Sequence, residues 1–222
     1  MAAWTPLDLA GLVAWYDASD LSTITDAGAG AVSQWADKSG NGNHVTQGTA
    51  GLRPTTGIRT QNGLNVIDFD GGDWLVSADI ADVAQPVTLA AVAMPDNLDD
   101  AAHNVWGNAP GLGNQPSFNV NGGVWRMYAG TPVVSAVPDT AVPRLVVAVF
   151  NGASSLLRIN GSQVVSGDAG ANPLRILSLG SNEGTSQFWD GWIAEAIAVE
   201  GAVAGSDLTN LESYLNAEWA VY

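Results

Sequence analysis

Short apolar runs, separated by glycine, asparagine, aspartate and proline, make up most of the 222-residue chain. Runs of this kind, rich in β-branched and aromatic side chains and bounded by turn residues, are typical of β-strands. The pattern predicts strands at Leu12–Tyr16, Val32–Trp35, Leu64–Phe69, Trp74–Ser77, Val87–Met94, Ser117–Val120, Val124–Tyr128, Arg144–Phe150, Ser155–Ile159, Gln163–Ser166, Arg175–Leu179 and Trp192–Val199.

Five Asn-Gly dipeptides, beginning at positions 41, 62, 121, 151 and 160, punctuate this series. Asn-Gly accepts positive φ at both central positions of a tight turn, so it is the strongest short signal for a hairpin. Two β-rich runs flank Asn160-Gly161, from Leu156 to Val165, and predict a hairpin there.

Only the end of the chain has the spacing of a helix. One apolar face would be formed by Leu208, Leu211, Leu215 and Trp219. Ser206 or Asp207 offers the N-cap. Many short strands with a single helix predict an all-β fold, a jelly-roll β-sandwich of two antiparallel sheets in one domain over 1–222.

The charge is strongly negative. The chain carries 22 acidic side chains against one lysine and six arginines, a formal net charge of −15. Such a surface repels phosphate backbones and anionic lipids, so nucleic acid is not an expected partner. The charge serves solubility, or favours divalent cations or tolerance of salt.

The same composition bears on redox chemistry and compartment. With no cysteine, neither disulfides nor thiolate metal sites can form. The first residues, Met-Ala-Ala-Trp-Thr-Pro, do not have the pattern of a secretory signal. The longest apolar run, Leu145 to Phe150, is too short to span a bilayer, so no membrane insertion is expected.

Two irregular segments carry clustered oxygen donors. The first runs from Trp35 to His44 and contains Asp-Lys-Ser-Gly-Asn-Gly-Asn; the second runs from Val66 to Leu75 and leads a strand into an acidic, glycine-rich turn. Potential calcium ligands in the two segments are Asp37, Ser39, Asn41, Asn43, Asp70 and Asp73. The alternate spacing from Asp37 is that of the first half of an EF-hand loop, but Gly48 stands where that loop places its glutamate. Either a calcium ion or Asx-type turns, in which these side chains cap backbone amides, accounts for the pattern.

These segments, read in order with others, resemble the concanavalin A-like, laminin-G-like jelly rolls, especially those of bacteriophage virion proteins. The similar segments are Leu12 to Ser19, Trp35 to His44, Asp68 to Gly71, Arg158 to Gly161, and Gly191 to Glu195 with the tail helix. The chain departs from that family after Phe69, where Gly72 and a lone Asp73 replace two adjacent acids.

The resemblance implies a non-enzymatic protein on the outside of a phage particle, as a decoration, fibre or tail-associated protein. Its expected partners are host surface polysaccharide and other virion proteins, with assembly as a homo-oligomer. It would be made in the host cytoplasm and carried on the virion. Two alternatives stay open: a structural virion module with no ligand, and a bacterial polysaccharide-binding or polysaccharide-cleaving domain.

Nine tryptophans supply the aromatic surface on which sugar rings stack. Trp15, Trp35, Trp192 and Trp219 fall at core positions of strands and helix. The remaining candidates in glycine-rich segments are Trp106, Trp125, Tyr128, His103, Asn104, Asn108 and Asn121. Loops on a rigid scaffold are where binding residues gather, so these side chains are the candidates for a glycan-binding surface, although packing in the core is the more common role for any one of them.

Catalytic signatures are weak. Glycosidases need two carboxylates across the scissile bond, and the nearest approach to such a pair on one strand is Glu195 with Glu200. Strand alternation predicts opposite faces for those two. Neither a nucleophile elbow nor a phosphate loop is present in the sequence. We therefore expect no catalytic residues.

Overall fold

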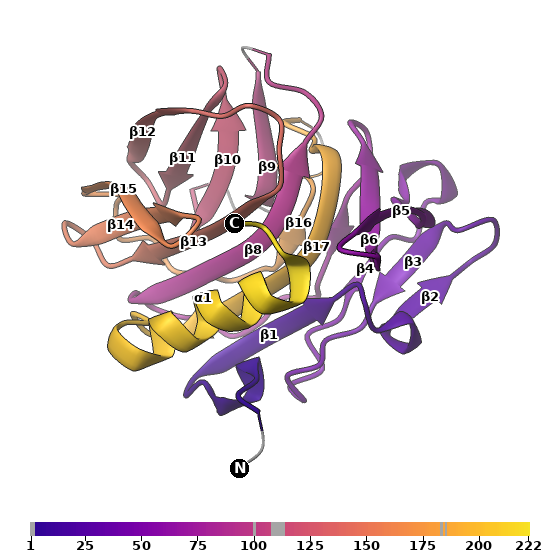
Figure 1. Ribbon diagram of the computed structural model, residues 1–222, viewed down its shortest axis with the longest axis horizontal. Helices are drawn as coiled ribbons and strands as arrows, with labels where there is room; N and C mark the ends of the chain where they lie inside the picture. Colours follow the sequence, from indigo (N-terminus) through magenta and orange to yellow (C-terminus); the bar gives the residue numbers. More distant parts are fainter. Residues whose placement is uncertain (1–2, 100, 108–113, 183, 185) are drawn as a thin grey trace.

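The computed structural model describes residues 3–99, 101–107, 114–182, 184 and 186–222, and these form two antiparallel sheets with one long helix (Figure 1). The all-β sandwich predicted from the sequence is confirmed. Sheet A has the strand order β15-β14-β13-β8-β17-β6-β5, with β1 also paired to β17; sheet B has the order β12-β11-β10-β9-β16-β7-β4-β3-β2.

Sheet A contains β1 (Leu12–Asp17), β5 (Thr55–Gln61), β6 (Leu64–Asp70), β8 (Val87–Pro95), β13 (Arg144–Phe150), β14 (Ser155–Ile159), β15 (Ser162–Gly167) and β17 (Asp190–Glu200). Sheet B contains β2 (Ile24–Asp26), β3 (Val32–Trp35), β4 (Val45–Thr46), β7 (Leu75–Val76), β9 (Ala102–Gly107), β10 (Ser117–Asn121), β11 (Val124–Tyr128), β12 (Pro132–Pro138) and β16 (Ser178–Leu179). Three 3₁₀ turns, η1 (Pro6–Asp8), η2 (Leu21–Thr23) and η3 (Ala50–Leu52), lie in the connections, and α1 (Gly205–Trp219) ends the chain.

The sequence did not predict strands β2, β4, β5, β9 and β12, each for a physical reason. β4 has only two residues, too few to form a pattern. β5 and β2 are largely exposed and lack an apolar alternation. β12 is bounded by Pro132 and Pro138, and proline is tolerated in sheets at edges, where β12 lies. β9 is buried along its whole length, and its polar residues His103 and Asn104 interrupt the apolar pattern.

The Asn-Gly turns behave as predicted at two hairpins. Asn160 and Gly161 have φ of 49° and 74° and join β14 to β15, with Ile159 opposite Ser162. Asn62 and Gly63, with φ of 52° and 76°, join β5 to β6 in the same way. These pairs of positive φ match the right-handed twist of the flanking strands.

The main core lies between the sheets and is dominated by aromatic rings. Among its fully buried side chains are Tyr16, Trp35, Phe69, Trp106, Phe118, Trp125, Phe150 and Trp189. Burial of this much aromatic surface supplies the dominant favourable contribution to folding.

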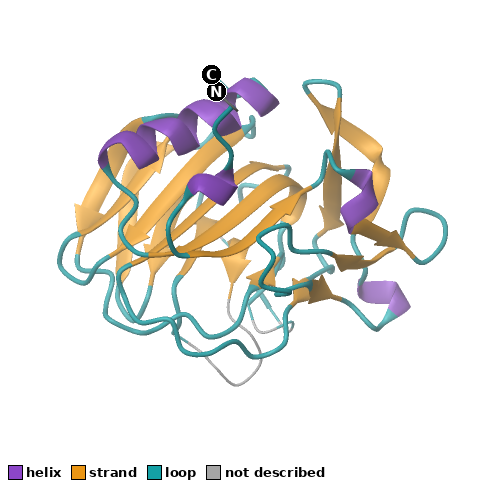
Figure 2. Cartoon of the chain, turned by 90° about the horizontal axis from the view of Figure 1, so that it is seen from below, coloured by secondary structure: helices purple, strands orange, loops and turns teal. Residues whose placement is uncertain are grey.

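A second core lies on the other face of sheet A, beneath α1 (Figure 2). Leu211, Leu215 and Trp219 of α1 are buried against Trp15 and Trp192 of the sheet, as their spacing in the sequence predicted. The N-cap prediction is wrong. The helix begins at Gly205 after Ala204, whose side chain makes no capping hydrogen bond, so Ser206 and Asp207 lie inside the first turn.

One carboxylate joins the helix to the sheet. Glu195 of β17 is fully buried and accepts hydrogen bonds from the indole Nε1 of Trp15 and of Trp219, each at 2.6 Å. Burial raises the pKa of Glu195 to about 8, with the Asp17 carboxylate adding to the effect, while hydrogen bonds from Trp219, Trp15 and Tyr214 oppose it.

A pH-dependent stability follows from Glu195. The folded state binds this proton more tightly than an unfolded glutamate of pKa 4.5. The free energy of unfolding therefore falls as the pH rises from about 4.5 to about 8, by up to about 1 kcal/mol per pH unit, and levels off above. Urea unfolding of the wild type and of Glu195→Gln across that pH range measures how the free energy of unfolding depends on pH. The variant, which has no carboxyl group to titrate, should show a shallower slope; equal slopes would contradict the assignment.

Candidate functional site

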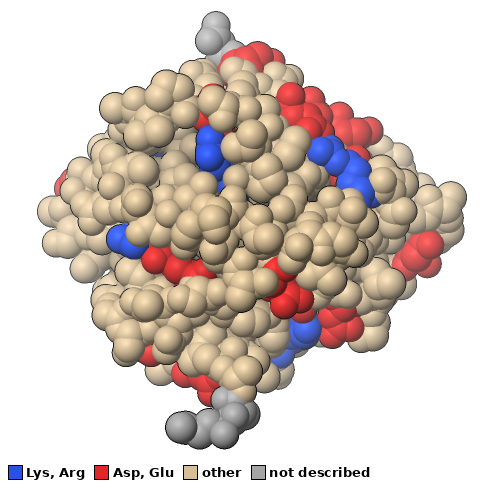
Figure 3. Space-filling model, viewed as in Figure 1, with Lys and Arg blue, Asp and Glu red and all other residues tan. Residues whose placement is uncertain are grey.

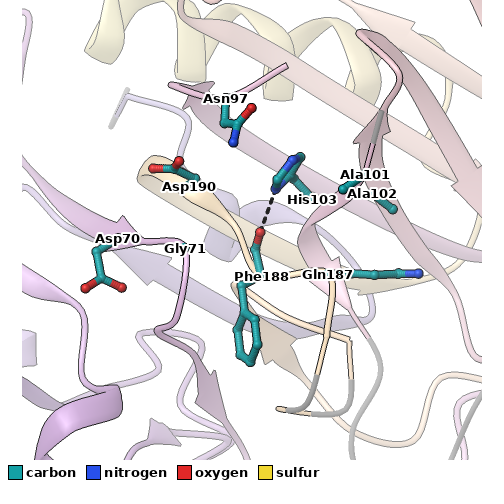
Figure 4. Close-up of a pocket in the computed structure, with 9 residues that line it drawn as sticks. All are labelled: Asp70, Gly71, Asn97, Ala101, Ala102, His103, Gln187, Phe188 and Asp190. Carbon is teal, nitrogen blue, oxygen red and sulfur yellow. Dashed lines mark hydrogen bonds between the residues drawn. The ribbon is translucent and has the colours of Figure 1, made fainter. Parts of the chain in front are cut away.

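A pocket of about 330 Å³ opens at one end of the sandwich, where strand ends from both sheets meet (Figure 4). It is lined by Asp70, Gly71, Asn97, Ala101, Ala102, His103, Gln187, Phe188 and Asp190. The lining combines carboxylate, amide and imidazole groups with small and aromatic apolar surface. This mixture is typical of sites that bind small polar ligands.

Strand pairing places the two carboxylates of this pocket. Asp70 ends β6 and Asp190 begins β17, and the two residues are partners in the antiparallel register. The backbone N–H of Gly71 donates to the carbonyl of Trp189 at 3.1 Å, which fixes the turn beside Asp190. Figure 4 shows the Asp70 carboxylate pointing away from Asp190, so the two acids do not face one another.

Asp99 organises the loop that closes the pocket between β8 and β9. Its carboxylate accepts from the backbone N–H of Ala101 at 2.8 Å and lies 2.9 Å from Nε2 of His103. The other ring nitrogen of His103, Nδ1, lies 2.8 Å from the carbonyl oxygen of Phe188. The hydrogen bond from His103 is the main reason that the pKa of Asp99 lies below its usual range.

Asn97 and Asp190 leave polar atoms available to a ligand. Asn97 accepts from the backbone N–H of Asp99 at 3.0 Å and its Nδ2 donates to Asp99 Oδ2 at 3.3 Å, which leaves one N–H of the amide for a ligand. The Asp190 carboxylate makes no hydrogen bond with any residue in the described ranges. In Figure 4 the Asn97 amide and the His103 ring lie on the same side of the pocket as Asp190.

The side chain of Gln187 carries the polar surface from the pocket onto the outer face of sheet B. It extends away from Asp190 in Figure 4 and accepts from Asn104 Nδ2 at 2.9 Å. Asn119 Nδ2 donates to Asn104 Oδ1 at 2.9 Å, and Arg126 Nε donates to Asn119 Oδ1 at 3.2 Å. We call Gln187, Asn104, Asn119 and Arg126 the amide row; it crosses β9, β10 and β11.

Two of the glycan-binding candidates are in the core, so the binding role is wrong for them and the packing alternative is confirmed. Trp106 and Trp125 are each 1% exposed. Trp106 Nε1 donates to the carbonyl of Ala90 across the sandwich, and Trp125 Nε1 donates to Asp139. Strand alternation turns both rings inward, with Phe118 between them in the core, because the sandwich needs large side chains to fill it.

The other predicted glycan-binding residues are distributed over the surface. His103 lines the pocket, Asn104 belongs to the amide row, and Tyr128 is half-buried on β11, where its hydroxyl contacts Asn114. Asn121 is half-buried at the end of β10. Asn108 lies outside the described residues.

The predicted metal ligands in the first segment act on the backbone. Asp37 Oδ1 accepts from the backbone N–H of Trp15 at 2.9 Å and of Ser39 at 2.8 Å. Asp37 Oδ2 accepts from the Ser39 hydroxyl at 2.7 Å and from the backbone N–H of Asn43 at 3.0 Å. Four protein donors thus occupy this carboxylate, as the Asx-turn alternative requires.

Asn41 and Asn43 tie the same loop to β1. Asn41 Nδ2 donates to the carbonyl of Leu12 at 2.7 Å, and Asn43 Nδ2 donates to that of Val13 at 2.9 Å. The backbone N–H of Asp37 donates to Nδ1 of His44 at 3.0 Å. The loop is therefore a hydrogen-bonded support for the first strand, and its side chains in this arrangement do not fit a calcium ion.

The second segment forms its own turn. The backbone N–H of Asp70 donates to Asp73 at 3.3 Å, and the backbone N–H of Gly72 donates to Asp70 Oδ1 at 2.9 Å. Burial raises the pKa of Asp73 to about 6. Across the part of the chain that the structure describes, no three His, Asp or Glu side chains are grouped as a metal site.

Sequence reasoning missed Asn97, Phe188, Asp190, Asn119 and Arg126. For the last two a signal existed: Phe118-Asn119-Val120 and Trp125-Arg126-Met127 each place one polar residue between inward-facing apolar ones. For the other three, the sequence holds no signal, because the pocket exists only where β6, β8 and β17 bring their ends together.

Comparison with known proteins bears on the fold. No protein-family model and no curated protein matches this chain. Trypanosoma rangeli sialidase in complex with the inhibitor DANA matches with a TM-score of 0.62 at 13% identity, covering 93% of this chain and 33% of the sialidase. This chain therefore spans about a third of that enzyme's length.

Two further solved structures also match. Domain 4 of AbnA, a GH43 extracellular arabinanase from Geobacillus stearothermophilus, solved with arabinotriose, gives a TM-score of 0.61 at 15% identity, covering 91% of this chain and 98% of that domain. The ligand-binding domain of botulinum neurotoxin serotype D, in complex with N-acetylneuraminic acid, gives 0.63 at 11% identity, covering 92% and 51%. At these identities the likeness shows the fold alone.

The hydrogen bonds of Asp37 predict its effect on stability. Asp37→Ala leaves backbone donors beside β1 without partners, which lowers the free energy of unfolding by about 2–4 kcal/mol. Asp26→Ala is the matched control, because Asp26 also caps two backbone amides, of Gly28 and Gly30, but in an exposed turn. We expect a loss below about 1 kcal/mol for that control in urea unfolding. Equal losses would contradict the supporting role of Asp37.

Thermal melting tests the calcium hypothesis on the same proteins. Because protein donors occupy the Asp37 carboxylate, we expect the melting temperature of the wild type to be the same with calcium and with chelator. A calcium-dependent rise that Asp37→Asn abolishes would instead establish a cation at this loop.

Proposed function

We propose that this chain is a non-catalytic glycan-binding module whose ligand enters the pocket at the end of the sandwich. The observation that carries the proposal is the pocket itself. Asn97 and Asp190 present an amide and a carboxylate around small apolar surface, beside a His103 ring whose two nitrogens are held by Asp99 and Phe188, within a volume suited to one or two sugar units. Sugars offer hydroxyl groups to such side chains and apolar C–H faces to such surface.

The solved structures support the proposal through their ligands. The arabinanase domain was solved with arabinotriose and the neurotoxin domain with N-acetylneuraminic acid, and both have the fold of this chain. A fold that presents glycans in two unrelated proteins can do so in a third, although the residues that bind must be argued for each.

The absence of catalysis is part of the proposal. Hydrolysis of a glycosidic bond needs two carboxyl groups aimed at one bond, and Asp70 points away from Asp190 in the pocket. Glu195 and Glu200 do not supply the pair, because Glu195 is buried beneath α1. A reducing-end assay with polysaccharides that the protein binds tests this part, and product release would contradict it.

Placement on a phage particle also belongs to the proposal. It rests on the resemblance of the Trp35–His44 loop, and of the turns at 68–71 and 158–161, to modules of virion proteins. Mass spectrometry of purified particles tests it.

Assembly with further copies or with other virion proteins has one supporting observation. Val134, Val137 and Val142, in and after the edge strand β12, are 48%, 50% and 39% exposed. Light scattering measures the oligomeric state, and a purely structural virion module would assemble without binding glycans.

A glycan array with the wild type, Asn97→Ala and Asp190→Asn tests the binding function. We expect binding to a limited set of glycans by the wild type. Each variant should bind that set about tenfold more weakly, a loss of about 1.4 kcal/mol, since Asn97→Ala removes the amide and Asp190→Asn removes the charge that strengthens hydrogen bonds to sugar hydroxyls.

Asn210→Ala is the matched control for the array, because Asn210 is also half-buried but lies on α1, on the far side of sheet A. It should bind as the wild type does. Failure of the wild type to bind any glycan, or equal binding by all the variants, would contradict the proposal.

A further inference from the structure

The basic side chains of this acidic protein are almost all neutralised within the molecule. Five of them form ion pairs with carboxylates: Lys38, Arg59, Arg144, Arg158 and Arg175. Arg53 instead donates to the backbone carbonyls of Gln47 and Gly48. On the face shown in Figure 3, blue side chains accordingly lie beside red ones.

Arg126 differs from these six side chains, because among the described residues it has neither a carboxylate nor a backbone carbonyl as a hydrogen-bond partner. It stands in the middle of β11 on the outer face of sheet B, opposite Val134 of β12. Among the described residues its guanidinium donates only to Asn119, through Nε, and no carboxylate pairs with it. The guanidinium is half-buried, and this burial lowers the pKa of Arg126. A positive charge is thus partly desolvated with no compensating anion in the described chain.

The amide row connects the Arg126 guanidinium to Gln187 through three hydrogen bonds. Arg126 donates to Asn119, Asn119 donates to Asn104, and Asn104 donates to Gln187. All three hydrogen bonds run the same way, away from the guanidinium, and such chains polarise one another. Asn104 and Asn119 are each 2% exposed, so the row is a fixed feature of the face and holds Nε of Arg126 in place.

With Nε held, the two terminal nitrogens of Arg126 are left to an external partner. A guanidinium presents paired N–H donors that match the two oxygens of a carboxylate. Nucleic acid is excluded as that partner, because a net charge of −15 repels an extended phosphate backbone. A single carboxylate on an otherwise neutral sugar chain meets far less repulsion.

We propose that Arg126 binds the carboxylate of an acidic sugar, so that the ligand class is anionic glycans such as those with uronic or sialic acid. The inference rests on the proposed glycan-binding function. The amide row begins at Gln187, which also lines the pocket, and neighbouring strands are about 5 Å apart. Arg126 therefore lies two strands, or about 10 Å, from β9, within reach of an oligosaccharide that starts in the pocket.

Paired ligands test this inference by isothermal titration. Each acidic oligosaccharide, a sialyllactose and an oligosaccharide with one uronic acid, carries a single carboxylate and is compared with its own carboxyl-reduced, neutral form. The wild type should bind at least one acidic form about tenfold or more tightly than its counterpart. Arg126→Gln should abolish that preference and bind the neutral form unchanged, and Arg126→Lys should keep only part of it.

Two controls separate binding from stability. Arg126→Gln retains a donor toward Asn119, so its melting temperature should stay within about 2 °C of the wild type. Arg53→Gln removes the same charge at a position away from the amide row, so it controls for the change in net charge. It should leave the preference for the acidic form intact.

The outcomes distinguish this inference from the function on which it rests. Binding of neutral and acidic forms with equal affinity would overturn the role of Arg126 and leave the glycan-binding function standing. An acidic preference that survives in Arg126→Gln would overturn it in the same way. Failure of every ligand to bind the wild type would overturn the proposed function, and this inference with it.

Discussion

The burial of sheet A on both of its faces is the constraint on which the rest of the structure depends. Strands β8, β13 and β17 are apolar almost without interruption, so one face packs into the sandwich and the other must be covered. Helix α1 provides that cover, and Glu195 joins it to the sheet through two indole N–H donors. Because β17 also pairs with β1, β6 and β8, these contacts fix most of the molecule.

Sheet B has the opposite character, and this difference places the candidate chemistry. Its inner face supplies Trp106, Phe118 and Trp125 to the core, and its outer face carries the amide row. No helix covers that outer face in the described structure. The pocket lies where the two sheets end, with Asp70 and Asp190 positioned by strand pairing and His103 by its hydrogen bonds. A rigid sandwich thus holds polar groups that loops alone could not keep in register.

Residue pattern predicted the scaffold better than the site. The Asn-Gly hairpin at 160–161, the apolar face of α1 and the burial of Trp15 and Trp219 all followed from local periodicity or turn chemistry. The binding role suggested for Trp106 and Trp125 was wrong, because a glycine-rich neighbourhood says nothing about which way a strand turns its rings. The oxygen-rich loop from Trp35 to His44 proved to be a set of backbone caps, since the carbonyls and amides of β1 compete for the same side chains.

The sequence by itself therefore determined the fold class, the tight turns and the apolar faces, because these depend on neighbours one to four residues apart. Only the tertiary structure decided which polar groups meet. Asp190 is far from Asn97 and His103 in the chain and shares a pocket with them through strand pairing and the ends of both sheets. Among the described residues no carboxylate pairs with Arg126, and this too follows from long-range packing, since it decides where the acidic side chains lie.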